Sequence, residues 1–159
     1  MKNSVNIDEL VNKAAIEAAK AAILEYDKVQ RDKRFHNTRV LMKNYNKLKE
    51  HIDNVRADVE FEIEEAEDKV WLTGMVRTKL RTIQMMAYID SALKIVKSKM
   101  ESDCVEYKFK AFELYYIEGK SNNEIISSLS CGKNQPKRWS DEVLNELSVY
   151  LWGIEALGI

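Results

Sequence analysis

The segment 117–129 constrains the fold more than any other part of this chain. Its Ser121-x-x-Glu124 spacing is typical of a capping box, in which the serine hydroxyl accepts the Glu124 N–H and the carboxylate accepts the Ser121 N–H. Gly119 lies just before it, where a left-handed helix end costs little. The apolar residues of the short helix that follows share one face; they are Ile125, Ile126 and Leu129. This pattern favours a helix-turn-helix, although any two packed helices joined by a tight turn share it.

The rest of the chain also favours helices. Pro136 is its single proline, and only five glycines occur in 159 residues. Two apolar stripes recur at steps of three and four and predict amphipathic helices; they are Ile83, Met86, Ile89, Leu93, Val96 and Met100, and then Trp139, Val143, Leu147, Leu151 and Ile154. No segment shows a convincing strand pattern. We therefore expect an all-α fold, with a helical N-terminal region over residues 1–102 and a helix-turn-helix unit over residues 103–159.

Three local signals divide the N-terminal region. A weaker capping box, Asn6 with Glu9, opens an alanine-rich helix that extends into the basic cluster 31–34. Residues 36–38 are predicted to break this helix, with the threonine of this segment capping the next one. Residues 73–74, a Thr-Gly pair, predict a corner.

The net charge of −1 hides a strong segregation of basic and acidic residues along the chain. Residues 26–51 carry eight Lys or Arg against three Asp or Glu, residues 52–68 carry eight acidic residues against one arginine, and residues 69–100 are basic again. Such blocks indicate either a phosphate-facing surface beside an acidic arm or neighbouring helices that neutralise one another.

Composition also limits the class of protein. No apolar run is long enough to span a bilayer, and no signal-peptide core is present. Cys104 and Cys131 stand far apart with no metal-binding spacing, so we expect free thiols and a soluble cytoplasmic protein.

No constellation of catalytic residues stands out. His36 and His51 have no partner at metal-ligand spacing, the carboxylates of 58–68 single out no acid–base pair, and no glycine-rich phosphate loop occurs. We therefore expect neither an enzyme nor a cofactor nor a metal.

A polar cluster precedes the last helix, and its members are Lys133, Asn134, Gln135, Lys137 and Arg138. Amide side chains can pair with adenine, arginine with guanine and lysine with phosphate. These five residues are the candidate contacts to double-stranded DNA, while Trp139 is expected to point into the core.

Parts of the chain resemble a known family. The stretches 115–125 and 147–154, together with Arg138-Trp139, are similar to the C-terminal part of ArpU-like phage transcription regulators, which in turn resemble region four of sigma factors. Arg34-Phe35-x-Asn37-Thr38 is similar to the family's N-terminal part, as is Tyr45-x-x-Leu48-Lys49. The resemblance implies a bacteriophage or prophage regulator of late genes that binds promoter DNA, with RNA polymerase and a second copy of the chain as candidate partners.

The chain departs from the usual helix-turn-helix pattern at four positions. That pattern has a small residue at Ile126, glycine at Ser130, a serine cap at Gly132 and a branched apolar residue at Pro136. Proline disfavours helical dihedrals in the residue before it, so we expect the last helix to start near Pro136, with 133–134 on the turn.

Two other functions fit the same pattern. A phage terminase small subunit also joins a helix-turn-helix to oligomerising helices, and it would recognise packaging DNA. Alternatively, the chain is a protein-interaction module, in which the helix-turn-helix no longer binds DNA and the charged N-terminal helices bind a partner.

Overall fold

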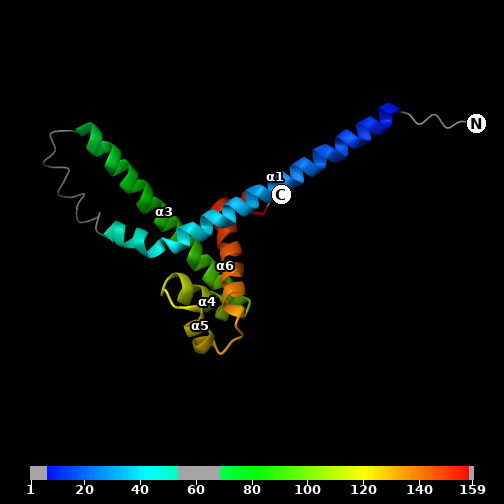
Figure 1. Cartoon of the computed structure of the whole chain (residues 1–159). Coiled ribbons are helices and arrows are strands. Elements are labelled where there is room, and N and C mark those ends of the chain that lie inside the picture. Colours follow the sequence, from blue (N-terminus) through cyan, green and yellow to red (C-terminus); the bar gives the residue numbers. More distant parts are fainter. Residues whose placement is uncertain (1–6, 54–68, 158–159) are drawn as a thin grey trace, which may run out of the picture.

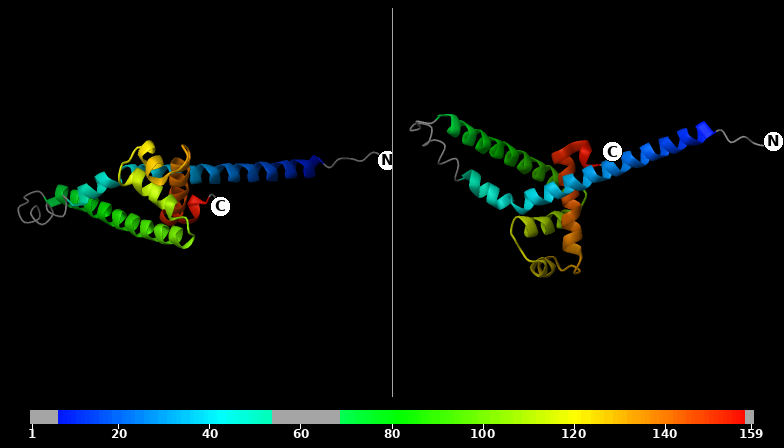
Figure 2. Two further views of the ribbon diagram at one scale, coloured as in Figure 1. Left: turned by 90° about the horizontal axis from the view of Figure 1, so that it is seen from below. Right: turned by 45° about the horizontal axis from the view of Figure 1, so that its top comes forward.

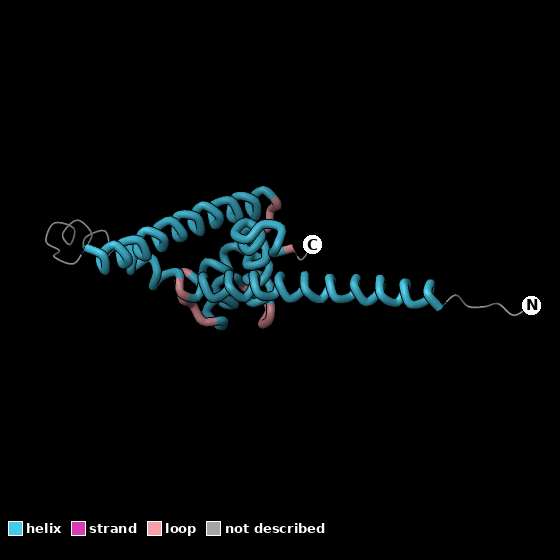
Figure 3. The backbone as a smooth tube through the Cα atoms, turned by 90° about the horizontal axis from the view of Figure 1, so that it is seen from above, coloured by secondary structure: helices cyan, strands magenta, loops and turns pink. Residues whose placement is uncertain are grey.

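The computed structural model describes residues 7–53 and 69–157, and this part of the chain is helical apart from short turns (Figures 1 and 3). The elements are α1 (Ile7–Lys43), a helical stretch over residues 45–53, α3 (Lys69–Ser102), α4 (Glu106–Tyr116), α5 (Asn122–Leu129), α6 (Gln135–Trp152) and the 3-10 turn η1 (Gly153–Ala156). No strand occurs among the described residues, so the predicted all-α class is confirmed.

Helix α6 is the central element of the arrangement. It contacts α1, α3, α4, α5 and η1, whereas most other pairs of helices meet less extensively or not at all. In Figure 1 and in the right view of Figure 2, α6 runs down from α1, and α4 and α5 lie around its lower end. Helix α6 is therefore the element against which the other helices pack.

The main core forms where the 45–53 stretch, α3, α4 and α6 meet. The predicted stripe of α3 faces it, since Met86, Ile89, Leu93, Val96 and Met100 are buried there. The other buried members come from five helical segments, α3 included; they are Met42, Tyr45, Ile52, Ala92, Phe109, Phe112, Tyr116, Val143, Leu144 and Leu147. This single cluster draws on both predicted regions. Whether 1–102 and 103–159 fold separately stays a prediction, although α3 ends at Ser102 as the boundary requires.

A smaller core joins α4, α5 and α6. Trp139 packs with Ala111, Leu114 and Ile125, and Tyr107 meets its ring edge-on at a centroid distance of 4.8 Å. The prediction that Trp139 is a core residue is therefore confirmed. Its ring fixes the start of α6 against α5, which determines where the first turn of α6 lies.

The predicted break at 36–38 is wrong. Helix α1 continues through this segment, and Thr38 is fully buried, with its hydroxyl donating to the Arg34 carbonyl one turn back. The same hydroxyl accepts a hydrogen bond from Trp152 Nε1 at 3.0 Å. Burial and this link to the end of α6 outweigh the turn propensity of the local sequence. The helix is interrupted only at Asn44, whose amide donates to the Val40 carbonyl.

The predicted corner at 73–74 is also wrong, because both residues lie inside α3. A glycine within a helix costs about 1 kcal/mol relative to alanine, which a long helix packed on a core tolerates. The Asn6–Glu9 capping box and the acidic 58–68 segment lie wholly or partly outside the described residues.

Acidic residues of α6 pair with cations on three neighbouring helices. Asp141 pairs with Arg39 of α1, Glu142 with Lys108 of α4 and Glu146 with Lys99 of α3. Hydrogen bonds to these glutamates raise the pKa of Lys108 and of Lys99. Arg39 and Lys99 belong to the two basic blocks, but the carboxylates that pair with them lie on α6 and not in the acidic block 52–68. Whether the charged blocks neutralise one another therefore stays a prediction.

The N-terminal half of α1 projects away from the other helices (Figures 1 and 2). Its side chains are exposed from Val11 to Tyr26, including several large apolar residues, namely Val11, Ile16, Ile23, Leu24 and Tyr26. Within the described part of the chain, no helix combines the length and hydrophobicity needed to cross a bilayer.

Replacing Trp139 with alanine should lower the free energy of unfolding by about 3–5 kcal/mol, because it empties the junction of α4, α5 and α6. Urea unfolding followed by circular dichroism measures this change. Tyr150→Ala, at an exposed position of the same helix, is the control and should change stability little. Equal effects of the two substitutions would contradict the core role of Trp139.

Thr38→Val should cost about 1–2 kcal/mol, because it keeps the shape of the side chain but leaves the Trp152 N–H without its acceptor. Thr38→Ser keeps the hydroxyl and should retain the tryptophan emission of the wild type. The two variants are compared by urea unfolding and fluorescence. A valine variant as stable as the wild type would show that this hydrogen bond does not join α1 to α6.

Candidate nucleic-acid interface

The start of α5 has the geometry that the sequence predicts. The Ser121 hydroxyl accepts the Glu124 N–H at 3.4 Å, and the Glu124 carboxylate accepts the Ser121 N–H at 2.8 Å. The Ser121 hydroxyl also donates to this carboxylate at 2.7 Å, and the hydrogen bonds from the Ser121 N–H and hydroxyl lower the pKa of Glu124. Gly119 has a φ of +67°, the left-handed conformation expected for it. The capping box is confirmed, and α5 therefore begins at a fixed point.

Backbone and side-chain hydrogen bonds also define the connection from α5 to α6. Ser130 adopts a left-handed conformation with φ 49° and ψ 47°, at the position where the usual pattern has glycine. The Gly132 N–H donates to the side-chain oxygen of Gln135, and Asn122 donates to the Lys133 carbonyl at 3.2 Å. The chain thus makes the turn with serine, and two amide side chains hold its shape.

Helix α6 begins at Gln135, with Pro136 as its second residue. The prediction that the helix starts near the proline, with Lys133 and Asn134 on the turn, is confirmed. The expectation that Pro136 keeps Gln135 out of the helix is wrong, because the helix begins one residue before the proline. Gln135 is held there by the hydrogen bond from the Gly132 N–H, which offsets the preference of a residue before proline.

The five candidate DNA contacts differ in how their side chains are engaged. Gln135 uses its carbonyl oxygen within the turn, and Arg138 pairs with Glu142 on its own helix at 3.3 Å. Asn134 is the N-cap residue of α6 but its side chain makes no capping bond. The side chains that form no hydrogen bond or ion pair with described residues are those of Lys133, Asn134 and Lys137. All five residues are exposed.

A groove of about 780 Å³ lies beside the first turns of α6. It brings together four of the five candidates with residues from α1, α4 and α5; its walls contain Arg39, Lys43, Tyr115, Tyr116, Asn122, Lys133, Asn134, Lys137, Arg138, Ser140 and Asp141. Gln135 is not part of this lining. Five of the lining residues are Lys or Arg and one is acidic, so the groove is strongly cationic.

Two of the other lining residues, Tyr116 and Ser140, are buried. Tyr116 is buried, and its pKa rises to about 12 chiefly through that burial, so its hydroxyl stays protonated at neutral pH. Ser140 is 4% exposed, and its hydroxyl has no hydrogen-bond partner among the described residues. Asp141 is held by Arg39 at 2.9 Å, which neutralises the one carboxylate of the groove.

Only part of the basic 26–51 segment reaches this groove. Arg39 and Lys43, one helical turn apart, line it. Elsewhere Arg31 pairs with Asp32, Arg34 lies over the Trp152 ring and Lys49 lies over the Tyr45 ring. The predicted basic surface is therefore divided, because a helix distributes successive side chains around its axis.

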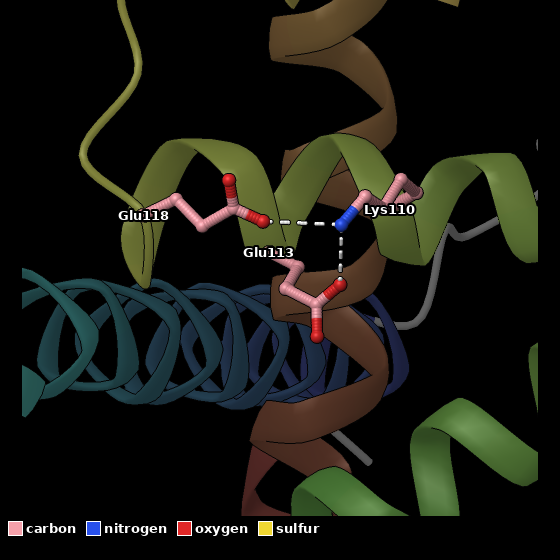
Figure 4. Close-up of polar contacts among 3 residues, drawn as sticks. All are labelled: Lys110, Glu113 and Glu118. Carbon is pink, nitrogen blue, oxygen red and sulfur yellow. Dashed lines mark hydrogen bonds and ion pairs between the residues drawn. The ribbon is translucent and has the colours of Figure 1, made fainter.

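A second charged cluster stabilises the end of α4 close to the turn. Lys110 donates to Glu113 at 3.0 Å and to Glu118 at 3.1 Å, and both carboxylates point toward its ammonium group (Figure 4). These hydrogen bonds raise the pKa of Lys110. The cluster fixes the segment that leads into Gly119 and α5.

Sequence reasoning did not single out Arg39, Lys43, Tyr115, Tyr116 and Asn122 as site residues. These residues reach the site through tertiary contacts that local sequence patterns do not indicate; the Arg39–Asp141 pair, for example, joins residues 102 positions apart. Among residues 7–53 and 69–157, no group of three or more His, Cys, Asp or Glu side chains is arranged to hold a metal ion.

Comparison with known proteins gives no further identification. No protein-family model, no curated protein and no solved structure matches this chain.

Proposed function

We propose that this chain is a sequence-specific, double-stranded DNA-binding regulator of transcription. In this proposal α5, the turn and α6 form a helix-turn-helix similar to sigma factor region four, and α6 is the recognition helix. Recognition helices of this class present their N-terminal residues to base edges in the major groove.

The observation that carries the proposal is the state of the first turn of α6. Its buried side faces the core through Trp139, while Asn134, Lys137 and Arg138 are exposed beside a cationic groove. A helix end that is fixed by packing and presents exposed polar side chains suits recognition of DNA, because little ordering of the backbone is needed on binding.

The chemistry of each side chain suggests its role. Asn134 has a free amide that can pair with adenine. Arg138 can form two parallel hydrogen bonds to guanine by leaving Glu142, which keeps its ion pair with Lys108. Lys133 and Lys137 can neutralise phosphates. Gln135 supports the turn, and its amide nitrogen is its one group left for DNA.

The biological setting in this proposal comes from the resemblance of residues 115–125 and 147–154 to ArpU-like regulators. It suggests bacteriophage or prophage late genes as the targets and RNA polymerase as a further partner. Selection of bound sequences from random and host–phage DNA at two salt concentrations tests the proposal. Enrichment of one motif that persists at the higher salt would support it, and no enrichment at either salt would overturn it.

A phage terminase small subunit is the second candidate. The projecting N-terminal half of α1 favours it, because exposed apolar side chains on an extended helix suit assembly with other copies. Light scattering coupled to gel filtration separates the two functions. A ring-forming oligomer that binds packaging DNA would favour the terminase function, whereas a monomer or dimer active on promoters would favour the regulator.

A protein-interaction module is the remaining alternative. The same exposed face of α1 would then bind a protein partner. Absence of salt-sensitive DNA binding by the full chain would favour this function over both DNA-binding candidates.

Arg138→Ala should cost about 1–3 kcal/mol of binding free energy on the selected site and little on unrelated DNA, because arginine reads guanine. Lys137→Ala should weaken binding to both DNAs alike and make binding less dependent on salt. Fluorescence anisotropy on selected and scrambled duplexes measures these effects. Lys94→Ala, at an exposed position of α3, is the matched control.

The losses of binding free energy on the two DNAs distinguish base reading from phosphate contact. Equal losses on both DNAs for Arg138→Ala would place that side chain on the phosphate backbone and leave base reading to Asn134 and Gln135. If neither substitution affects binding beyond the Lys94 control, this surface of α6 is not the DNA site.

A further inference from the structure

The cationic groove extends beyond the recognition helix onto α1. We infer that it holds the sugar-phosphate backbone of the bound DNA, with Lys43 of α1 as a further contact beside those of α6 and Arg39 fixing α1 in place. This inference rests on the proposed function. It adds α1 to the DNA-binding surface and gives the N-terminal region a direct role in binding.

The groove carries positive charge that no described residue neutralises. Lys43, Lys133 and Lys137 line the groove from two parts of the chain, and none of their ammonium groups pairs with a described residue. Like charges gathered around one cavity repel one another, so an anion in the groove relieves this repulsion. Asp141, the single acidic lining residue, is already neutralised by Arg39.

Hydrogen-bond donors line the other walls of the groove. Tyrosine hydroxyls and asparagine amides are common donors to phosphate oxygens, and Tyr115, Asn122 and Asn134 supply such groups. Ser140 adds a buried hydroxyl that no described residue satisfies. An apolar or small cationic ligand would use none of these donors, whereas a phosphodiester chain can use several.

Helix α1 is held in a fixed position beside α6. The ion pair of Arg39 with Asp141 ties α1 to the second turn of α6, and Arg39 also lies over the Phe35 ring at 4.7 Å. Lys43 follows one turn later on α1 and is exposed. Contacts from two helices that are fixed to each other set the orientation of a duplex as well as its affinity.

The test measures the salt dependence of DNA binding for the full chain. A labelled duplex of mixed sequence is titrated by fluorescence anisotropy at several salt concentrations. Lys43→Gln should reduce the slope of log affinity against log salt by about one, so a fourfold rise in salt should weaken the variant about threefold less than the wild type. Lys28→Gln is the matched control, an exposed α1 lysine outside the groove, and should keep the wild-type slope.

Each result bears on the inference. If Lys43→Gln keeps the wild-type slope, or if Lys43→Gln and Lys28→Gln reduce the slope equally, the inference about α1 is overturned. The proposed function would then depend on the contacts of α6 alone. No salt-sensitive DNA binding by the wild type would overturn the inference together with the proposed function. Both variants should fold, because both positions are exposed and neither lysine has an ion pair with a described residue. Circular dichroism checks this.

Discussion

Burial of α6 on several sides is the constraint on which the rest of this structure depends. Val143, Leu144 and Leu147 have no exposed surface, and they lie in the core shared with α3 and α4. Three carboxylates on the same helix bind cations of α1, α3 and α4. Thr38 and Trp152 then join the far end of α6 to α1. A helix held this way has little freedom to move relative to its neighbours.

This rigidity determines what the first turn of α6 can do. The capping box of α5, the left-handed Ser130 and the amide of Gln135 fix the turn, and Trp139 fixes the helix that follows. Asn134, Lys137 and Arg138 are consequently presented from a fixed backbone, as DNA recognition requires. The same packing places α1 beside the groove. Arg39 and Lys43 therefore line a site formed mainly by residues far away in the chain.

The sequence predicted most of the local structure, because caps and apolar stripes act over one or two turns. The capping box at Ser121, the stripe of α3, the buried Trp139 and the helix start near Pro136 are all local signals that the structure confirms. The prediction at 36–38 was wrong because burial of Thr38 outweighed the turn propensity around it. The prediction at 73–74 was wrong because Gly74, although exposed, lies inside a long helix that tolerates a single glycine. The groove could not be predicted, since it exists only where α1 crosses α6, and no periodicity encodes that crossing.

The central claim is that the groove between α1 and the start of α6 is a DNA-binding surface. Titration of the ¹⁵N-labelled chain with a DNA duplex, followed by amide chemical shifts, tests it most directly. The account predicts that shifts concentrate at residues 133–138 and 39–43, while the projecting half of α1 and the exposed face of α3 around Tyr88 and Ile95 change little. Shifts confined to those two exposed faces, or no shifts at all, would contradict it.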